Sequence, residues 1–210
     1  MNGYLSEFLT LALVHFLAVV SPGPDLAVTT ANSVRYGRKI GIITAIGIGC
    51  GISIHVIYSL IGLSFLHEQS TLFNVIRILG ALYLLYLAYL LIRSGKESDK
   101  NFSAEAKEIT SYSAFLNGFL TNVLNPKAVL FFVAIFTSLI SPNTPLFLKI
   151  GYGLWMCSVN ALWFTFVALF FTKPAIRQAF LLKSHYFNRI MGVILALLAF
   201  YVGYEMLGIE

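Results

Sequence analysis

Two charged side chains interrupt otherwise apolar stretches of this sequence, and each directly follows a proline. Asp25 follows Pro24 in the run Ser-Pro-Gly-Pro-Asp, and Lys127 follows Pro126 in the run Leu-Asn-Pro-Lys. A carboxylate and an ammonium that face one interior could bind the opposite charges of a small zwitterion. The alternative to a binding site is a purely structural ion pair, in which the two charges neutralise each other and bind no ligand.

The backbone beside these charges is expected to be broken. A proline lacks the N–H donor and disfavours helical angles in the residue before it. A helix that starts at Gly23-Pro24 or at Pro126 directs free N–H groups toward an anion such as a carboxylate. Asn122 and Asn125 are expected on one helical face just before Pro126, where they would bond either freed backbone groups or a polar substrate. All of these residues are candidate substrate-binding residues.

Two histidines, His15 and His55, stand in apolar stretches of the first 66 residues. An imidazole titrates near neutral pH and could carry a coupling proton. The candidates for proton coupling are therefore Asp25, His15 and His55. The alternative for each histidine is a hydrogen-bonded packing residue.

Enzymatic chemistry is not expected. No nucleophile is accompanied by a base and an orienting acid, and no Cys/His cluster has the spacing of metal ligands. We therefore expect neither a metal nor a cofactor. Cys50 and Cys157 occupy roughly corresponding places in the two halves, so a membrane carrier of thiol electrons is an alternative function. Buried structural cysteines are usually inert, which weakens that alternative.

The composition indicates a membrane protein. Of the 210 residues, 58% are hydrophobic and 11% are charged, against roughly a quarter charged in an ordinary soluble domain. A nucleic-acid partner is not expected from the net charge of +5, because the basic residues stand in short runs between apolar segments. The expected partners are the lipid bilayer, a small solute and protons. Glycine spacings also permit a homo-oligomer.

The apolar segments predict an all-α fold with six transmembrane helices in a single transporter domain over residues 1–210. The expected segments are about 4–34, 40–66, 72–92, 113–140, 146–172 and 190–207. The first and the fourth segments contain the proline breaks. One polar loop, about 93–112, separates the two halves and carries mixed charges.

The distribution of lysine and arginine predicts the orientation in the membrane. Most of the 14 basic residues fall after the first, third and fifth segments: Arg35, Arg38, Lys39, Arg93, Lys96, Lys100, Lys107, Lys173, Arg177, Lys183 and Arg189. Cytoplasmic loops carry the excess of basic residues. The loop at 93–112 is therefore expected in the cytoplasm and both termini in the periplasm.

The two halves of the chain look like copies of each other. Pro126-Lys127 aligns with Pro24-Asp25, and the run RILGALYLLYLAY resembles RIMGVILALLAFY. Repeat one covers about 4–92 and repeat two about 113–207. Because each repeat holds three spans, the second must be inverted relative to the first. Inverted repeats with paired broken helices are typical of secondary transporters, whose substrate site lies near the membrane midplane.

Two long runs resemble a known family. The run SPGPDLAVTTANSVRYGRKIGIITAIGIGCGISIHVIYSLIGL resembles the first half of amino-acid exporters of the LysE/RhtB type, and GFLTNVLNPKAVLFFVAIF resembles their second signature. The Pro-Gly-Pro-Asp form is more similar to the RhtB branch, which exports threonine, homoserine and other largely neutral amino acids. The resemblance implies efflux across the bacterial inner membrane, driven by the proton motive force. Where the family often has Pro-Gln-Phe, this chain has Thr137-Ser138-Leu139.

Overall fold

The computed structural model describes residues 2–65, 71–94, 109–141 and 143–206, which form helices joined by short connections. Within these ranges the helices are α1 (Asn2–Val20), α2 (Pro24–Tyr36), α3 (Arg38–Phe65), α4 (Thr71–Arg93), α5 (Ser111–Val123), α6 (Pro126–Ser138), α7 (Leu146–Phe170) and α8 (Pro174–Met206). The all-α prediction is confirmed for the part of the chain that the structure describes.

Both predicted helix breaks are present. Gly23 precedes α2 in a fully extended conformation (φ −177°, ψ −171°), and Pro24 is the first residue of that helix. In the second half, α5 and α6 meet at an angle of 53°, and Pro126 begins α6. A proline is tolerated at the first position of a helix because that residue's N–H has no partner within the helix.

The expectation that Asn122 and Asn125 share one helical face is wrong. Asn122 lies in the last turn of α5, whereas Asn125 is the extended residue before α6. The reason is the proline that follows Asn125, because a residue before proline avoids helical angles. The two asparagines therefore have separate roles.

The helices pack as an elongated bundle around α3 and α4. Helix α3 packs against α2, α5 and α7, and α4 pairs with α8 along much of its length. Helix α6 lies against both α3 and α4, while α1 contacts α7 and α8. Large apolar side chains fill the space between these helices, among them Phe132, Phe136, Met156 and Leu195. The two broken helices thereby meet inside the bundle.

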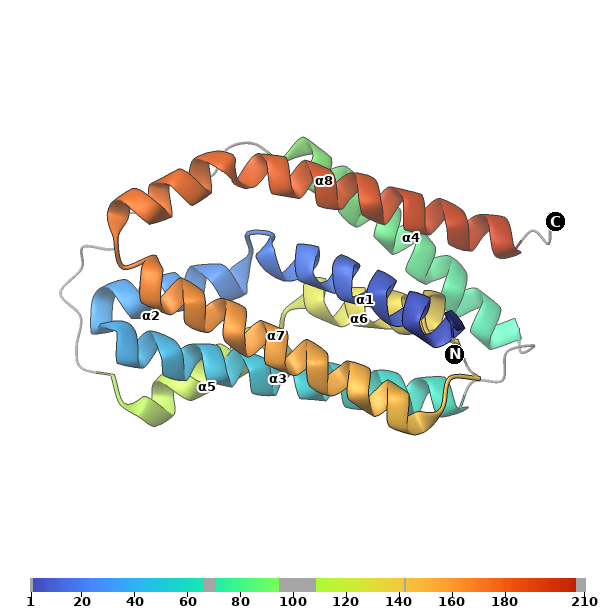
Figure 1. Cartoon of the computed structure of the whole chain (residues 1–210), viewed down its shortest axis with the longest axis horizontal. Coiled ribbons are helices and arrows are strands. Elements are labelled where there is room, and N and C mark those ends of the chain that lie inside the picture. Colours follow the sequence, from blue (N-terminus) through green and yellow to red (C-terminus); the bar gives the residue numbers. More distant parts are fainter. Residues whose placement is uncertain (1, 66–70, 95–108, 142, 207–210) are drawn as a thin grey trace.

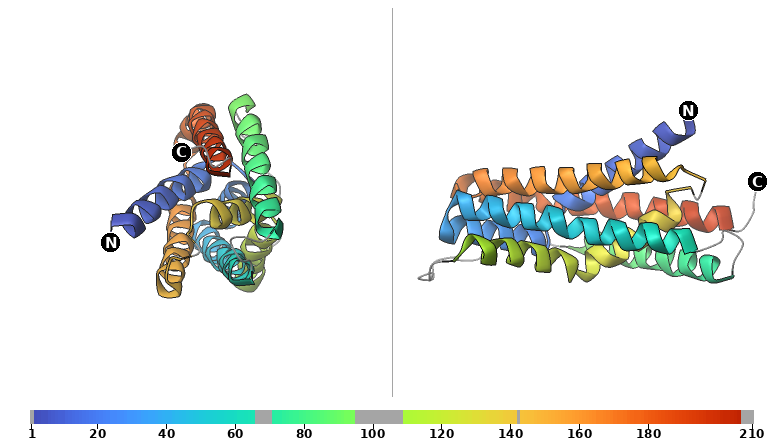
Figure 2. Two further views of the ribbon diagram at one scale, coloured as in Figure 1. Left: turned by 90° about the vertical axis from the view of Figure 1, so that its right-hand side faces the viewer. Right: turned by 90° about the horizontal axis from the view of Figure 1, so that it is seen from below.

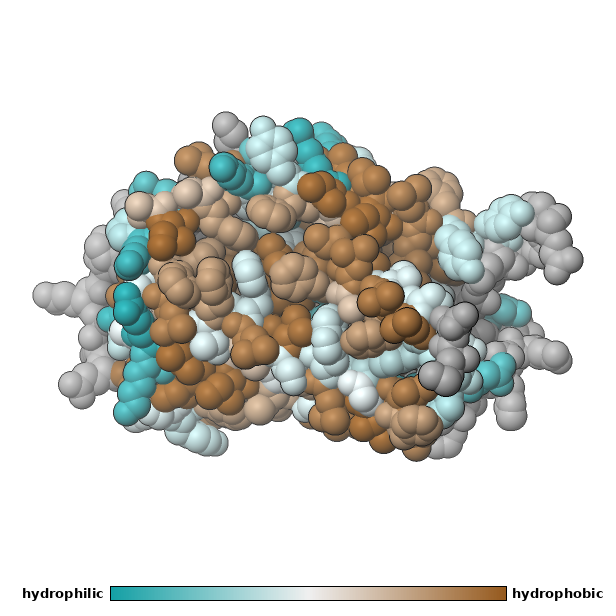
Figure 3. Space-filling model, in the orientation of Figure 1, coloured by the Kyte–Doolittle hydropathy of each residue, from teal (hydrophilic) through white to brown (hydrophobic). Residues whose placement is uncertain are grey.

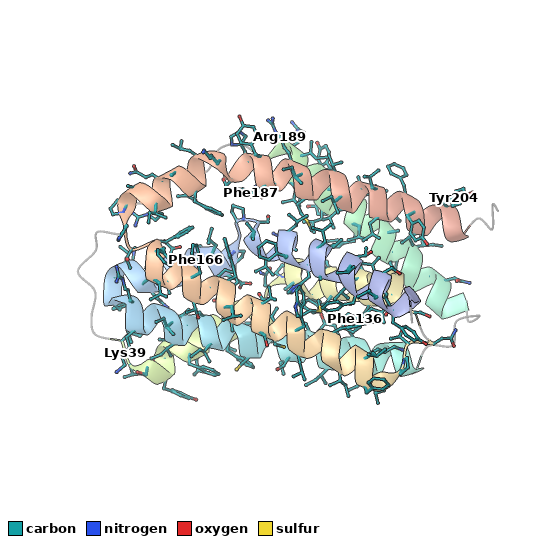
Figure 4. All side chains as sticks on the ribbon, viewed as in Figure 1. Lys39, Phe136, Phe166, Phe187, Arg189 and Tyr204 are labelled. Carbon is teal, nitrogen blue, oxygen red and sulfur yellow. The ribbon has the colours of Figure 1, made fainter. Side chains whose placement is uncertain are left out.

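The direction of each helix can be followed along the long axis in Figure 1. Helix α1 begins and α8 ends at the same end of the bundle, and both breaks lie near its middle. Lys39 lies at one end and Tyr204 at the other (Figure 4). The two broken helices run in opposite directions. In Figure 1 the chain runs from right to left through α1 and α2, and from left to right through α5 and α6.

The surface has the polarity of a membrane protein. Apolar side chains cover much of the middle of the face seen in Figure 3, whereas hydrophilic residues gather at its left end and along part of its upper edge. Among the described residues, four helices are long and apolar enough to cross a membrane, and α5 with α6 makes a fifth if the bent pair counts as one span. The described apolar part of α4 is shorter, Ile78–Arg93. The prediction of a multi-pass helical membrane protein is confirmed, whereas the number of six spans stays a prediction.

The last helix begins earlier than expected. The sequence predicted a segment from about residue 190, but α8 starts at Pro174 and runs without interruption to Met206. Its first half places Arg177 against the end of α7, where Nη1 donates to the carbonyl oxygen of Phe171 (3.2 Å). A basic side chain at a helix C-terminus satisfies carbonyl groups that lack helical partners. The basic residues between 177 and 189 therefore lie on a helix and not in a loop.

Candidate functional site

A cavity lies where the two broken helices meet. Its polar lining includes His15, Ser21, Asp25, Asn122, Asn125 and Lys127. Its volume is about 60 Å³. A cavity of that size holds several water molecules, or a small solute in their place.

Asp25 and Asn122 join the two halves of the chain inside this cavity. Asn122 Nδ2 donates to Asp25 Oδ2 (2.9 Å) across 97 positions of sequence. The other carboxylate oxygen, Oδ1, is buried without a hydrogen-bond partner among the described residues, and so is Asn122 Oδ1. Buried polar atoms are normally hydrogen-bonded, so such exceptions call for a partner, which can be a water molecule or a ligand in the cavity. The two oxygens are acceptors available to a cationic group.

Lys127 lines the same cavity from the second break. Its Nζ donates to Ser21 Oγ (3.2 Å), and its positive charge acts on the Asp25 carboxylate. Ser21 in turn donates to Asn188 Oδ1 on α8 (2.8 Å), and Asn188 Nδ2 donates to Ser94 Oγ after α4 (2.9 Å). A hydrogen-bonded chain thus connects the lysine to the α4–α8 pair.

The two helix starts differ in how they are capped. Asn125 Oδ1 accepts a hydrogen bond from the backbone N–H of Lys127 (3.0 Å), which satisfies one free donor of α6. Gly23 provides no side chain for the corresponding position of α2. Gly23 and Pro24 line the cavity, whereas Pro126 is not part of the lining. The backbone N–H groups at the start of α2 therefore lack the side-chain acceptor that the start of α6 has.

His15 lines the cavity from α1 and is 1% exposed. Its Nε2 lies 3.0 Å from Asn160 Nδ2 on α7. The rings of Phe131, Phe132 and Trp155 surround it, with centroids 5.7–6.5 Å from that of the imidazole. His15 Nδ1 is buried without a hydrogen-bond partner among the described residues.

His55 stands behind Asn122 and is not part of the cavity lining. Its Nε2 lies 3.0 Å from the backbone oxygen of Asn122, and its Nδ1 lies 3.1 Å from the hydroxyl of Tyr58. That hydroxyl donates to the backbone oxygen of Val129 on α6 (2.9 Å). His55 therefore contacts both elements of the second break.

Close packing of α3 against α5 brings Asn122 to this position. A Cβ atom at Gly51 would lie 2.8 Å from Asn122 Oδ1. One turn earlier, a Cβ at Gly47 would overlap the carbonyl oxygen of Phe115, and one at Gly118 would overlap that of Thr44. Small residues allow helix backbones to approach closely in membranes, so these glycines set the distance between the two helices.

The cysteines are separate from this site. Cys50 and Cys157 are free thiols on α3 and α7, and neither lines the cavity. The observed cavity therefore gives no support to thiol-based electron transfer.

Residues 16–206 match the LysE type translocator family. The chain belongs to this family. The resemblance noted in the two signature runs is thereby confirmed, and the cavity between the broken helices lies inside a translocator.

Individual relatives in the LysE family cover nearly the whole chain. The threonine efflux protein of Escherichia coli K12 is 31% identical over 196 residues, which are 91% of this chain and 95% of the relative. The threonine efflux protein of Salmonella typhi is 31% identical over 195 residues, with the same coverage. The uncharacterized membrane protein YahN of E. coli K12 is 29% identical over 201 residues, 94% of this chain and 89% of the relative. No solved structure matches the chain at a significant level.

Three residues of this LysE-family site were not among the substrate-binding or proton-coupling candidates named from the sequence. Ser21 accepts a hydrogen bond from Lys127 and donates one to Asn188. Asn160 contacts His15. Ser21 had a signal, because it opens the Ser-Pro-Gly-Pro break. Asn160 and Asn188 are single polar residues on long helices, and a single polar residue on a membrane helix does not reveal its partner.

Proposed function

We propose that this LysE-family protein exports a small neutral amino acid, such as threonine, from the bacterial cytoplasm across the inner membrane, driven by the proton motive force. The observation that carries the proposal is the cavity in which Asp25 and Lys127 meet beside two broken helices. Intramembrane charges in contact with a cavity are functional by default. The threonine efflux relatives support the choice of substrate class.

A zwitterionic amino acid complements this cavity. Its ammonium would be bound by Asp25 Oδ1 and Asn122 Oδ1, the two buried acceptors without partners. Its carboxylate would be bound by the ammonium of Lys127 and by the backbone N–H groups at the uncapped start of α2. Charge-assisted hydrogen bonds of this kind are shorter and stronger than neutral ones. Asn125 caps α6, and its side chain also interacts with the Asp25 carboxylate.

We infer that the protein works by alternating access between two inverted repeats. The opposite directions of corresponding helices and the matching breaks support this. So does the packing of α2 against α7 and of α6 against α3, which are equivalent contacts if the halves are exchanged. Rocking of one repeat against the other would open the central cavity to each side in turn.

For proton coupling, Asp25 is the proposed carrier because it lies in the cavity and would bind either a proton or the substrate ammonium. His55 would assist. Its Nε2 faces a carbonyl oxygen and its Nδ1 faces a hydroxyl whose hydrogen is donated to Val129. Both nitrogens therefore face acceptors, which suits a protonated ring, whereas a neutral ring requires the Tyr58 hydroxyl to turn from Val129 toward Nδ1. Asn122 connects His55 with Asp25, because its backbone oxygen contacts His55 and its side chain bonds Asp25.

Everted inner-membrane vesicles provide the test of function and of coupling. Vesicles that contain the protein should accumulate labelled threonine when their lumen is acidified, and an uncoupler should abolish the accumulation. Vesicles without the protein are the control. Accumulation no greater than in the control would contradict amino-acid export, whereas accumulation that persists with the uncoupler would contradict proton coupling alone.

The orientation gives a separate expected result. Alkaline phosphatase fused after residue 210 should be active, and the same enzyme fused at Lys100 should be inactive. The enzyme needs the oxidising periplasm to form its disulfides, and the basic residues predict that the loop containing Lys100 is cytoplasmic. Immunoblots of both fusions control for expression. The reverse activity pattern would contradict the predicted orientation, and equal activity of the two fusions would contradict the odd number of spans on which the inverted repeat rests.

A further inference from the structure

We propose that an anionic phospholipid binds to the outer surface of the α4–α8 pair, with its phosphate between Arg93 and Arg189. This site lies outside the central cavity, and it would exist whichever solute the cavity carries. The ligand is a lipid of the surrounding bilayer with a net negative headgroup, such as phosphatidylglycerol.

The end of α4 and the middle of α8 touch along a seam. Asn188 Nδ2 donates to Ser94 Oγ (2.9 Å). A Cβ atom at Gly192 would lie 2.7 Å from Ile92 Cγ1, so these two residues are also in direct contact. Higher residue numbers on α8 meet lower numbers on α4 along this seam. The two helices therefore run in opposite directions, as Figure 1 shows.

Arg93 and Arg189 lie on the same side of this seam. Arg93 comes one residue after Ile92, and Arg189 comes one residue after Asn188. Each residue of an α-helix is turned by about 100° from the one before it, because a turn contains about 3.6 residues. In two helices that run in opposite directions, an equal turn away from the seam leads to the same face of the pair. Both arginines are exposed, so their guanidinium groups can reach a common ligand.

Both guanidinium groups keep hydrogen-bond donors for a ligand. Arg93 donates to the Tyr89 hydroxyl, and its guanidinium carbon lies 5.3 Å from the centre of that ring. An arginine has five N–H donors in a planar fork, so this contact leaves donors unused. In the part of the chain that the structure describes, no carboxylate pairs with Arg93 or Arg189. A phosphate accepts paired hydrogen bonds from arginine and neutralises its charge.

The surroundings of the arginines favour a lipid over a soluble anion. Ile92, Ile190 and Val193 lie near them on the two helices and are 40–52% exposed. Arg189 lies part-way along the bundle, whereas Lys39 lies at its end (Figure 4). A charged side chain among lipid-facing apolar residues costs free energy unless it finds a partner. The phosphate would neutralise the arginines while the acyl chains cover the apolar side chains, and basic sites between membrane helices bind anionic headgroups in this way.

The test titrates the purified full-length protein in detergent with phosphatidylglycerol and with phosphatidylcholine of the same acyl chains. Native mass spectrometry measures the bound lipid. The wild type should bind the anionic lipid at least about tenfold more tightly, because each arginine near an anionic headgroup strengthens binding about fivefold. The double variant Arg93→Gln/Arg189→Gln should lose this preference. Lys183→Gln, which removes an exposed positive charge from the same helix, should keep it.

Each contrary outcome overturns the proposal. Equal binding of the two lipids by the wild type would show that the arginines select no anionic headgroup, for example because carboxylates of the loop after Ser94 neutralise them. A preference that persists in the double variant would place the lipid elsewhere, and an equal loss in Lys183→Gln would indicate only general electrostatic attraction. Displacement of the lipid by soluble glycerol 3-phosphate would indicate a site for a soluble anion.

Folding and transport are controlled separately. The melting temperature of each variant is measured without added lipid. If the double variant does not fold, Arg189→Gln alone is titrated, and it should weaken binding of phosphatidylglycerol about fivefold. Unchanged binding by that variant would contradict the site. The titration uses no transport measurement, so a failure of amino-acid export in vesicles would leave this result unaffected.

Discussion

Asp25→Asn and Lys127→Met should each abolish export, and the double variant should recover membrane abundance without recovering export. Each single change leaves the opposite charge in the cavity without its electrostatic partner. Breaking a buried charge pair typically costs about 3–5 kcal/mol, whereas replacing both partners is often neutral. The single variants should therefore also be less abundant in the membrane than the wild type.

The double variant distinguishes a binding site from a structural pair. If the two charges bind the ammonium and carboxylate of a substrate, their joint removal leaves a stable protein that cannot hold the zwitterion. If they only stabilise the bundle, their joint removal should restore both stability and export. Membrane abundance by immunoblot and threonine accumulation in vesicles are measured for all three variants. A double variant that exports threonine normally would contradict the binding role.

A matched control separates removal of this particular charge from loss of a positive charge in general. Lys39 is an exposed lysine near the end of the bundle (Figure 4). Lys39→Met removes the same chemical group as Lys127→Met but lies far from the cavity. It should leave both abundance and export close to those of the wild type. Asp25→Glu tests in addition whether transport continues when the carboxylate lies about one methylene farther from the backbone of α2.

Gly118→Ala should destabilise the protein strongly. Export should fall at least as much as the amount of folded protein falls. The new Cβ would overlap the carbonyl oxygen of Thr44 and would lie 2.9 Å from its carbonyl carbon. Because these are backbone atoms of α3, no side-chain rotation relieves the overlap, and α5 must move away. Overpacking costs about 1–3 kcal/mol and sometimes more. Asn122, one turn later on α5, would be displaced from Asp25.

Gly151→Ala on α7 is the control for this prediction. Gly151 also lies within a helix, and a Cβ there would meet nothing within 4 Å. Both substitutions improve helix propensity by about 1 kcal/mol, so only the steric contact differs between them. Melting temperature in detergent and membrane abundance should fall for Gly118→Ala and stay the same or rise for Gly151→Ala. Equal behaviour of the two variants would contradict a close α3–α5 contact.

Much of the architecture could be predicted from the sequence because it depends on local composition. A helix in a membrane must bond all its backbone groups internally, so long apolar runs are read as helices. The breaks at Pro24 and Pro126 follow from the geometry of proline itself. The start of α8 was placed too late because its first half carries several charges. That half is helical in the structure, and its Arg177 is 9% exposed and bonded to the end of α7.

The sequence by itself determined which residues bear charge, where the helices break and that the chain belongs in a membrane. Only the tertiary structure decided that Asn122 bonds Asp25, that Ser21 bonds Lys127, and that Asn160 bonds His15. The physical reason is that these helices are apolar around most of their circumference, so periodicity does not reveal which face turns inward. The rotation and approach of each helix depend on contacts between segments far apart in the chain. Gly51 illustrates this, because the room it leaves for Asn122 becomes visible only once α3 and α5 lie together.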